Sequence, residues 1–318
     1  MIVAAGAAAT AIAAGGAGSQ SLVPAEPTVP AEPAVPAKPA VLAKPAVLAR
    51  PIPSTGERVP VVGLGTWQTF DVVPARERAA RGTLLAALLD AGGTLVDSSP
   101  MYGEAEAVIG EGLRQPVPGK VFAATKVWTV GRQWGVDQMN RSMKLWGLSR
   151  IDLMQVHNLL DWRTHLQTLQ AWKAEGRVRY VGVTTSHGRR HDELERIMRR
   201  EPLDFVQFTY SLADRDADKR LLPLAAERGI AVIANRPFDG GALFDAVKGR
   251  ALPGWAAEIG CANWAQAFLK FIVSHPAVTC AIPATSQRAH LHENVGALAG
   301  PLPDAVLRAR IARDFDRG

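Results

Sequence analysis

From about residue 59 onward, short apolar runs alternate with longer segments in which apolar residues recur at helical spacing. The short runs predict eight strands, at 61–67, 94–96, 121–126, 151–157, 178–183, 205–208, 230–234 and 278–282. The longer segments predict helices that include 75–91, 191–200, 219–228, 255–274 and 304–315. Strands that alternate with helices are typical of parallel β/α units, so we expect an α/β fold of the (β/α)8 TIM-barrel class. In that fold the active site lies at the carboxyl ends of the strands.

The first part of the chain has a different pattern. Residues 2–18 are small, apolar and uncharged, too short and too weakly hydrophobic to predict a membrane span. They are typical of the apolar part of an export signal that lacks its basic start. We therefore expect an exported or periplasmic protein whose reading frame begins upstream of Met1, with a twin-arginine signal as the route. A disordered Ala-rich tail on a cytoplasmic protein is the alternative.

A six-residue repeat follows, five copies running from VPAEPT at residue 23 to VLARPI at residue 52. The prolines fix φ and remove amide donors, which predicts an extended, semi-rigid spacer without a fold of its own. The expected domains are a signal-like segment at 1–22, a Pro/Ala/Val linker at 23–53 and the barrel at 54–318.

Composition narrows the class of protein. A chain of 318 residues that is 47% hydrophobic can bury one large core. The net charge of +6 is not gathered into a basic run that would predict nucleic-acid binding, although it suits a phosphate-bearing ligand. We interpret Arg189-Arg190 and Arg199-Arg200 as a solvated face. Cys261 and Cys280 have no metal-ligand spacing, so we predict buried free thiols and no metal. The Gly63-Leu64-Gly65 run lacks the third glycine of a Rossmann loop, so we do not predict a Rossmann fold.

Four polar residues stand at or just past the ends of three successive predicted strands. They are Asp97, Tyr102, Lys126 and His157. Each alone could have a structural role, but neighbouring strand ends share one rim of a barrel, so we expect the four to converge. Reduction of a carbonyl group needs such a set. A lysine ammonium lowers the pKa of a nearby tyrosine, a carboxylate holds the lysine, and a histidine orients the carbonyl oxygen.

Residues 59–299 resemble the aldo-keto reductases. The resemblance is carried by Gly65-Thr66-Trp67, Lys126-Val127-Trp128, the LSRIDL run before His157-Asn158, Gln207, and the IPATS run before Glu293-Asn294. It implies an NAD(P)H-dependent carbonyl reductase that acts on a small aldehyde or ketone, with Tyr102 as general acid. NADPH is the expected cofactor, with NADH as an alternative. The resemblance further implies cofactor contacts by Gly65, Thr66, Trp67, Asn158, Thr184, Thr185, Gln207, Asn235, Arg236, Pro283, Thr285, Ser286, Arg288 and Asn294. It implies a substrate pocket lined by Trp67, Trp128 and Trp162.

Several positions depart from the family pattern. Thr184-Thr185 replaces a Ser-Asn pair, and Asn235 replaces an aromatic residue that stacks on the nicotinamide. Ala284 and His290 stand where a lysine and an arginine grip the cofactor phosphate, and Arg288 between them is the expected substitute. These departures keep open a non-catalytic nucleotide-binding sensor or scaffold. A barrel isomerase or aldolase with a Schiff-base lysine at Lys126 is a third hypothesis. The sequence does not predict the oligomeric state.

Overall fold

The computed structural model describes residues 47–317. The predictions made for residues 1–46 lie outside this part of the chain. Eight parallel strands form one sheet in chain order: β3 Leu64–Gly65, β4 Leu95–Asp97, β5 Phe122–Val127, β6 Ile151–Val156, β7 Val178–Thr184, β8 Phe205–Thr209, β9 Ala231–Asn235 and β10 Val278–Ala281. Bridges from Val62 to Ala281 and from Gly65 to Ala284 join the first strand to the last. The sheet is therefore closed, and the expected (β/α)8 fold is confirmed.

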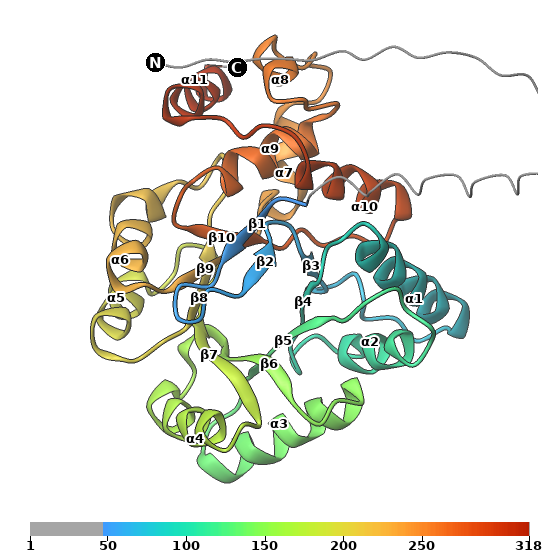
Figure 1. The fold of residues 1–318 in the computed structure, drawn as a ribbon, viewed down its shortest axis with the longest axis vertical. Coiled ribbons are helices and arrows are strands. Elements are labelled where there is room, and N and C mark those ends of the chain that lie inside the picture. The colour runs from blue at the N-terminus through green and yellow to red at the C-terminus, as the bar shows by residue number, and fades with distance from the viewer. Residues whose placement is uncertain (1–46, 318) are drawn as a thin grey trace, which may run out of the picture. The chain divides into compact units, whose positions relative to one another are not determined.

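Helices surround the ring of strands (Figure 1). The α-helices are α1 Ala75–Asp90, α2 Ala105–Leu113, α3 Arg132–Trp146, α4 Trp162–Ala174, α5 His191–Arg200, α6 Leu221–Arg228, α7 Ala242–Ala246, α8 Trp255–Glu258, α9 Trp264–Val273, α10 Arg288–Val295 and α11 Ala305–Asp316. Short 3-10 turns are η1 His157–Leu159, η2 Asp216–Lys219, η3 Asp239–Gly241 and η4 Gly296–Leu298. In the described residues, no helix is long and apolar enough to cross a membrane.

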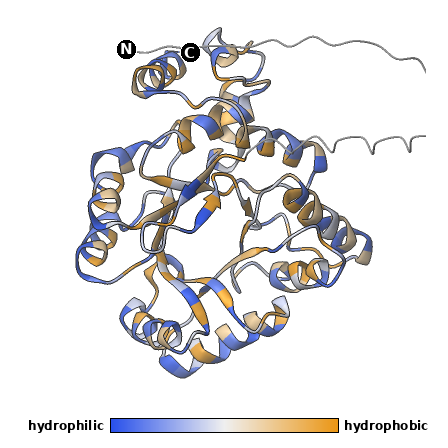
Figure 2. Cartoon of the chain, viewed as in Figure 1, coloured by the Kyte–Doolittle hydropathy of each residue, from blue (hydrophilic) through white to orange (hydrophobic). Residues whose placement is uncertain are grey.

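Helix α5 illustrates how the sequence pattern places a helix against the sheet. Its apolar residues Leu194, Ile197 and Met198 recur at helical spacing and are buried, while its remaining positions are mostly charged. The hydropathy colouring in Figure 2 shows both apolar and polar residues on the helices around the ring. Arg199 and Arg200, at the end of α5, are exposed, as expected of a solvated face.

Two predicted elements are shorter than expected. The strand predicted at 61–67 is reduced to β3, and the glycines around it serve close backbone contacts. A Cβ on Gly63 would lie 2.6 Å from the carbonyl oxygen of Leu95, so only glycine fits there. The helix predicted at 255–274 breaks into α8 and α9. Gly260 has φ +63 at the break, and the Asn263 side chain caps α9 by accepting a hydrogen bond from the Gln266 amide.

A hairpin closes the amino-terminal end of the barrel. Strands β1 Ala49–Pro51 and β2 Arg58–Pro60 pair antiparallel, and Figure 1 shows them across the middle of the ring. Ile52 and Val59 of this hairpin belong to one buried cluster with residues that begin strands, among them Phe122 and Phe205. The domain boundary predicted at residue 54 is therefore too late, because residues assigned to the linker fold with the barrel.

Candidate active site

One buried lysine joins the residues that the strand pattern singled out. Lys126 on β5 is fully buried, and its Nζ atom donates to Asp97 Oδ2 at 2.6 Å and to the carbonyl oxygen of Ser98 at 2.7 Å. The same Nζ lies 3.4 Å from the hydroxyl of Tyr102. The Tyr102 ring meets the ring of His157 edge to face, with 5.7 Å between the ring centres. All four side chains thus lie at one end of the barrel.

The charge on Lys126 is secured by its neighbours. Burial alone lowers the pKa of a lysine, but the negative charge of Asp97 and the contact with Tyr102 outweigh burial and raise the pKa of Lys126. The lysine is therefore an ammonium at neutral pH. Because the carboxylate and the ammonium are both withdrawn from water, this ion pair is far less screened than one on the surface.

Two opposing effects act on the pKa of Tyr102. Burial raises the pKa of Tyr102, and the nearby Lys126 charge opposes this rise without reversing it. Lys126 therefore lowers the pKa of Tyr102, as expected, but the pKa is raised on balance because the cost of burying a phenolate is larger. Tyr102 is consequently a neutral phenol at neutral pH, which is the form that can donate a proton.

His157 begins η1, directly after β6. Burial, together with the Lys126 charge, lowers the pKa of His157 to about 2, so the imidazole is neutral. Its Nδ1 atom lies 2.9 Å from the hydroxyl oxygen of Ser99, a fully buried residue. Sequence reasoning missed Ser99. Its place between the strand that ends at Asp97 and the loop that carries Tyr102 was the available signal.

Two carboxamides hold the other oxygen of Asp97. Gln155 on β6 and Gln207 on β8 each donate from Nε2 to Asp97 Oδ1 at 3.0 Å. Asn235 donates in turn to Gln207 Oε1 at 3.4 Å. Sequence reasoning also missed Gln155. The signal was a polar residue flanked by the apolar residues Met154 and Val156 of the predicted strand, which is unusual in a buried parallel sheet.

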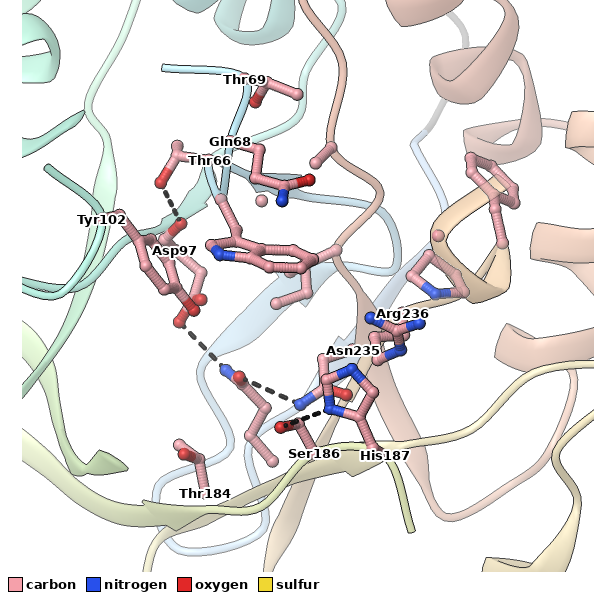
Figure 3. A pocket seen from close by; sticks show the side chains of 18 of the residues that line it. Thr66, Gln68, Thr69, Asp97, Tyr102, Thr184, Ser186, His187, Asn235 and Arg236 are labelled. Atoms are coloured by element: carbon pink, nitrogen blue, oxygen red, sulfur yellow. Dashed lines mark hydrogen bonds between the residues drawn. The ribbon is translucent and has the colours of Figure 1, made fainter. Parts of the chain in front are cut away.

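A cavity of about 510 Å³ opens beside these residues. Figure 3 shows Asp97 and Tyr102 on one side of it, with Ser186, His187, Asn235 and Arg236 on the other. Nine of the predicted cofactor contacts line it: Gly65, Thr66, Trp67, Asn158, Thr184, Thr185, Gln207, Asn235 and Arg236. Five others do not: Pro283, Thr285, Ser286, Arg288 and Asn294.

The three predicted pocket tryptophans behave differently from one another. Trp67 lines the cavity, whereas Trp128 and Trp162 do not. The Gln138 side chain bonds both the amide and the carbonyl of Trp128, and the indole of Trp128 is exposed. The indole Nε1 of Trp162 donates to Glu193 at 3.0 Å. The Glu193 bond thus holds the Trp162 indole outside the cavity.

A scan against known families decides the assignment. The model of the Aldo/keto reductase family matches residues 61–310. The chain belongs to this family. It is 29% identical over 259 residues to Methylglyoxal reductase YeaE of Escherichia coli (strain K12), which covers 78% of this chain and 89% of that protein. It is 24% identical over 230 residues to an NADH-specific methylglyoxal reductase of the same organism, which covers 61% of this chain and 68% of that protein.

A solved structure supports the same assignment. The aldo/keto reductase from Klebsiella pneumoniae, crystallised in complex with NADP and acetate, superposes with a TM-score of 0.70 at 25% identity. The match covers 82% of this chain and 93% of that chain. The cofactor in that complex is of the class that the sequence predicts for this aldo/keto reductase.

The cavity of this aldo/keto reductase fits such a cofactor. Thr185 Oγ1 is buried at the cavity and has no hydrogen-bond partner in residues 47–317. A buried hydroxyl without a partner is costly, so it indicates a place for a polar ligand group such as a carboxamide. Arg189 and Arg236 also line the cavity. Burial and the positive charges of these two arginines lower the pKa of His187. Guanidinium groups bind phosphates well, so this part of the cavity suits the phosphates of such a cofactor. Arg189 is exposed, as expected of a solvated face, and it also lies at the edge of the cavity.

Proposed function

We propose that this aldo/keto reductase reduces a small aldehyde or ketone to an alcohol, with Tyr102 as general acid assisted by Lys126, Asp97 and His157. The single observation that carries the proposal is the buried contact of one ammonium with both a carboxylate and a phenol at the cavity. No structural need of the barrel explains an ammonium that contacts two further ionisable side chains at that point.

The nicotinamide cofactor supplies the hydride when it is bound. Thr185, Gln207 and Asn158 would hold its carboxamide end, and Arg189 and Arg236 its phosphates. NADPH is the proposed cofactor because the Klebsiella pneumoniae relative was crystallised with NADP. NADH, which carries the same pyrophosphate, remains the alternative, because one relative is named an NADH-specific methylglyoxal reductase.

Tyr102 supplies the proton. As the carbonyl carbon gains the hydride electron pair, the carbonyl oxygen gains negative charge and takes the proton from the Tyr102 hydroxyl. The C=O double bond becomes a single C–O bond, and the phenolate that remains lies beside the Lys126 ammonium, which stabilises it. Asp97 holds the lysine in place through its 2.6 Å contact. A proton from water then restores the phenol.

Two relatives are named methylglyoxal reductases, and we propose a small dicarbonyl of that kind as a substrate of this protein. We further propose that the protein works outside the cytoplasm, on the pattern of residues 2–18. Fractionation of cells that produce the full chain tests localisation. Recovery only in the cytoplasmic fraction would contradict it.

The function is tested with the full chain. Nicotinamide fluorescence gives the Kd for NADPH and NADH, and turnover is then followed with methylglyoxal and a panel of aldehydes. Tyr102→Phe is expected to lower kcat by about 10²–10⁴-fold, the usual contribution of general acid catalysis, with the cofactor Kd within about twofold of wild type. Tyr180→Phe is the matched control, because that tyrosine bonds Glu57 and Thr55 away from the cavity. Tight cofactor binding without turnover of any carbonyl would favour the sensor or scaffold hypothesis instead.

A further inference from the structure

The two serines that follow Asp97 have different surroundings. Ser98 and Ser99 are both fully buried. The hydroxyl of Ser98 has no hydrogen-bond partner in the described part of the chain, whereas that of Ser99 lies 2.9 Å from His157 Nδ1. Ser99 Oγ also accepts a hydrogen bond from the Met101 amide at 3.2 Å. One of two adjacent and equally buried hydroxyls is therefore aimed at the imidazole.

The direction of the Ser99–His157 hydrogen bond follows from counting donors. Ser99 Oγ receives the amide hydrogen of Met101, so its own hydrogen needs an acceptor. His157 Nδ1 is the one acceptor within reach among the bonds made by residues 47–317. If Nδ1 carried the proton instead, the Ser99 hydrogen would be buried without a partner, which proteins avoid. The hydroxyl therefore donates to Nδ1.

The tautomer of His157 follows from this bond. The ring is neutral, because burial and the Lys126 charge keep its pKa far below the usual range. A neutral imidazole carries one proton, and with Nδ1 acting as acceptor that proton is on Nε2. Nε2 has no protein partner in residues 47–317, and His157 lines the cavity. The free donor of the ring is thus the atom available to a ligand.

The geometry points to Ser99 as the positioning residue that fixes His157 in its Nε2–H form, so that the ring donates to the substrate carbonyl oxygen. Without this bond the ring loses the interaction that selects between its two neutral forms. In the Nδ1–H form, an unprotonated Nε2 would offer a lone pair to an oxygen that needs a donor. The effect on catalysis rests on the proposed carbonyl reduction, whereas the assignment of the tautomer does not.

The test pairs a spectroscopic measurement with kinetics. ¹⁵N-labelled histidine in the full chain is observed by NMR without cofactor, and the His157 signals are assigned by their loss in His157→Gln. Wild type and Ser98→Ala are expected to show the Nε2–H form. Ser99→Ala is expected to show a mixture of the two forms, and Ser99→Thr, which keeps a hydroxyl, is expected to restore the wild-type spectrum in part.

Kinetics then connect the tautomer to turnover. Ser99→Ala is expected to lower kcat roughly tenfold, less than the roughly 10²–10³-fold loss typical when such a donor is itself removed. The NADPH Kd should stay within about twofold, and Tyr180→Phe, which lies away from the cavity, should match wild type. The Nδ1–H form in wild type would overturn the inference, and so would a pure Nε2–H form with wild-type kcat in Ser99→Ala. Because the wild-type spectrum needs only the His157→Gln assignment and no substrate, a Ser99→Ala chain that does not fold leaves the first of these outcomes decisive. Absence of turnover in wild type would contradict the proposed function alone.

Discussion

Replacing Lys126 by methionine should reveal how strongly the barrel depends on one buried charge. Methionine keeps much of the side-chain length but removes the ammonium that contacts Asp97 at 2.6 Å, Ser98 O at 2.7 Å and the Tyr102 hydroxyl. Lys126 is 0% and Asp97 2% exposed, so the carboxylate left behind cannot turn to water. Breaking a buried ion pair in this way typically costs about 3–5 kcal/mol.

That cost is large enough to measure by two methods. In a domain of this size, 1 kcal/mol shifts the Tm by about 2–4 °C, so Lys126→Met should lower the Tm by roughly 10 °C. Urea unfolding should give the same loss of free energy. Turnover should also be abolished, because the phenolate of Tyr102 would form without a neighbouring positive charge.

A double-mutant cycle isolates the ion pair from packing. Asp97→Asn combined with Lys126→Met removes both charges and leaves no unpaired one. The loss in free energy of unfolding of the double variant should therefore be smaller, by at least about 2 kcal/mol, than the summed losses of the two single variants. Lys219→Met is the matched control, because Lys219 and Asp216 form a pair whose side chains are 76% and 70% exposed. Lys219→Met should therefore leave the free energy of unfolding almost unchanged, because water screens both charges. Single variants whose costs add within about 0.5 kcal/mol would refute a strongly coupled buried pair.

Three further predictions follow from the site. The pKa of His157 is about 2 in the folded chain against 6.5 ordinarily, so below about pH 6.5 the unfolded chain binds a proton that the folded chain does not. The free energy of unfolding should therefore fall as the pH drops. Urea unfolding of His157→Gln between about pH 6 and pH 5 should show a weaker pH dependence than wild type, by up to about 1.4 kcal/mol per pH unit. An unchanged pH dependence would contradict a depressed His157 pKa. Gln155→Leu, which removes a 3.0 Å bond to Asp97, should cost about 1.5–3 kcal/mol in urea unfolding, and a loss below about 0.5 kcal/mol would count against that bond. Arg236→Ala should raise the NADPH Kd roughly tenfold in a fluorescence titration, whereas Arg288→Ala, outside the cavity, should change it less than about twofold; the reverse ranking would return the phosphate contact to Arg288.

The positions of the main site residues could be predicted from the sequence because they depend on one simple rule. Asp97 and Lys126 lie on strands that the apolar pattern located within a residue or two, and parallel strands present their ends at one rim. The pattern carries no information on which way a side chain turns once it leaves the strand. For that reason it gave no account of Ser99, whose Oγ atom lies 2.9 Å from His157 Nδ1, and it did not predict that the Trp162 indole bonds Glu193.

The direction of the Tyr102 pKa was beyond the sequence for another reason. It depends on two opposing effects, burial and the Lys126 charge, and only coordinates show how deeply the phenol is buried. The break between α8 and α9 was similarly hidden, because Gly260 and Asn263 interrupt a run that is otherwise apolar at helical spacing. The surroundings of single residues thus determine both the direction of the Tyr102 pKa and the position of the helix break.

The β1–β2 hairpin and the cavity lie at opposite ends of the barrel. The hairpin seals the end of the barrel where the strands begin, through Ile52 and Val59, while the cavity beside Tyr102 opens where the strands finish. We therefore expect the cofactor and the substrate to enter from the side of the barrel opposite the hairpin, and substitutions at Ile52 or Val59 should lower stability while leaving the KM unchanged.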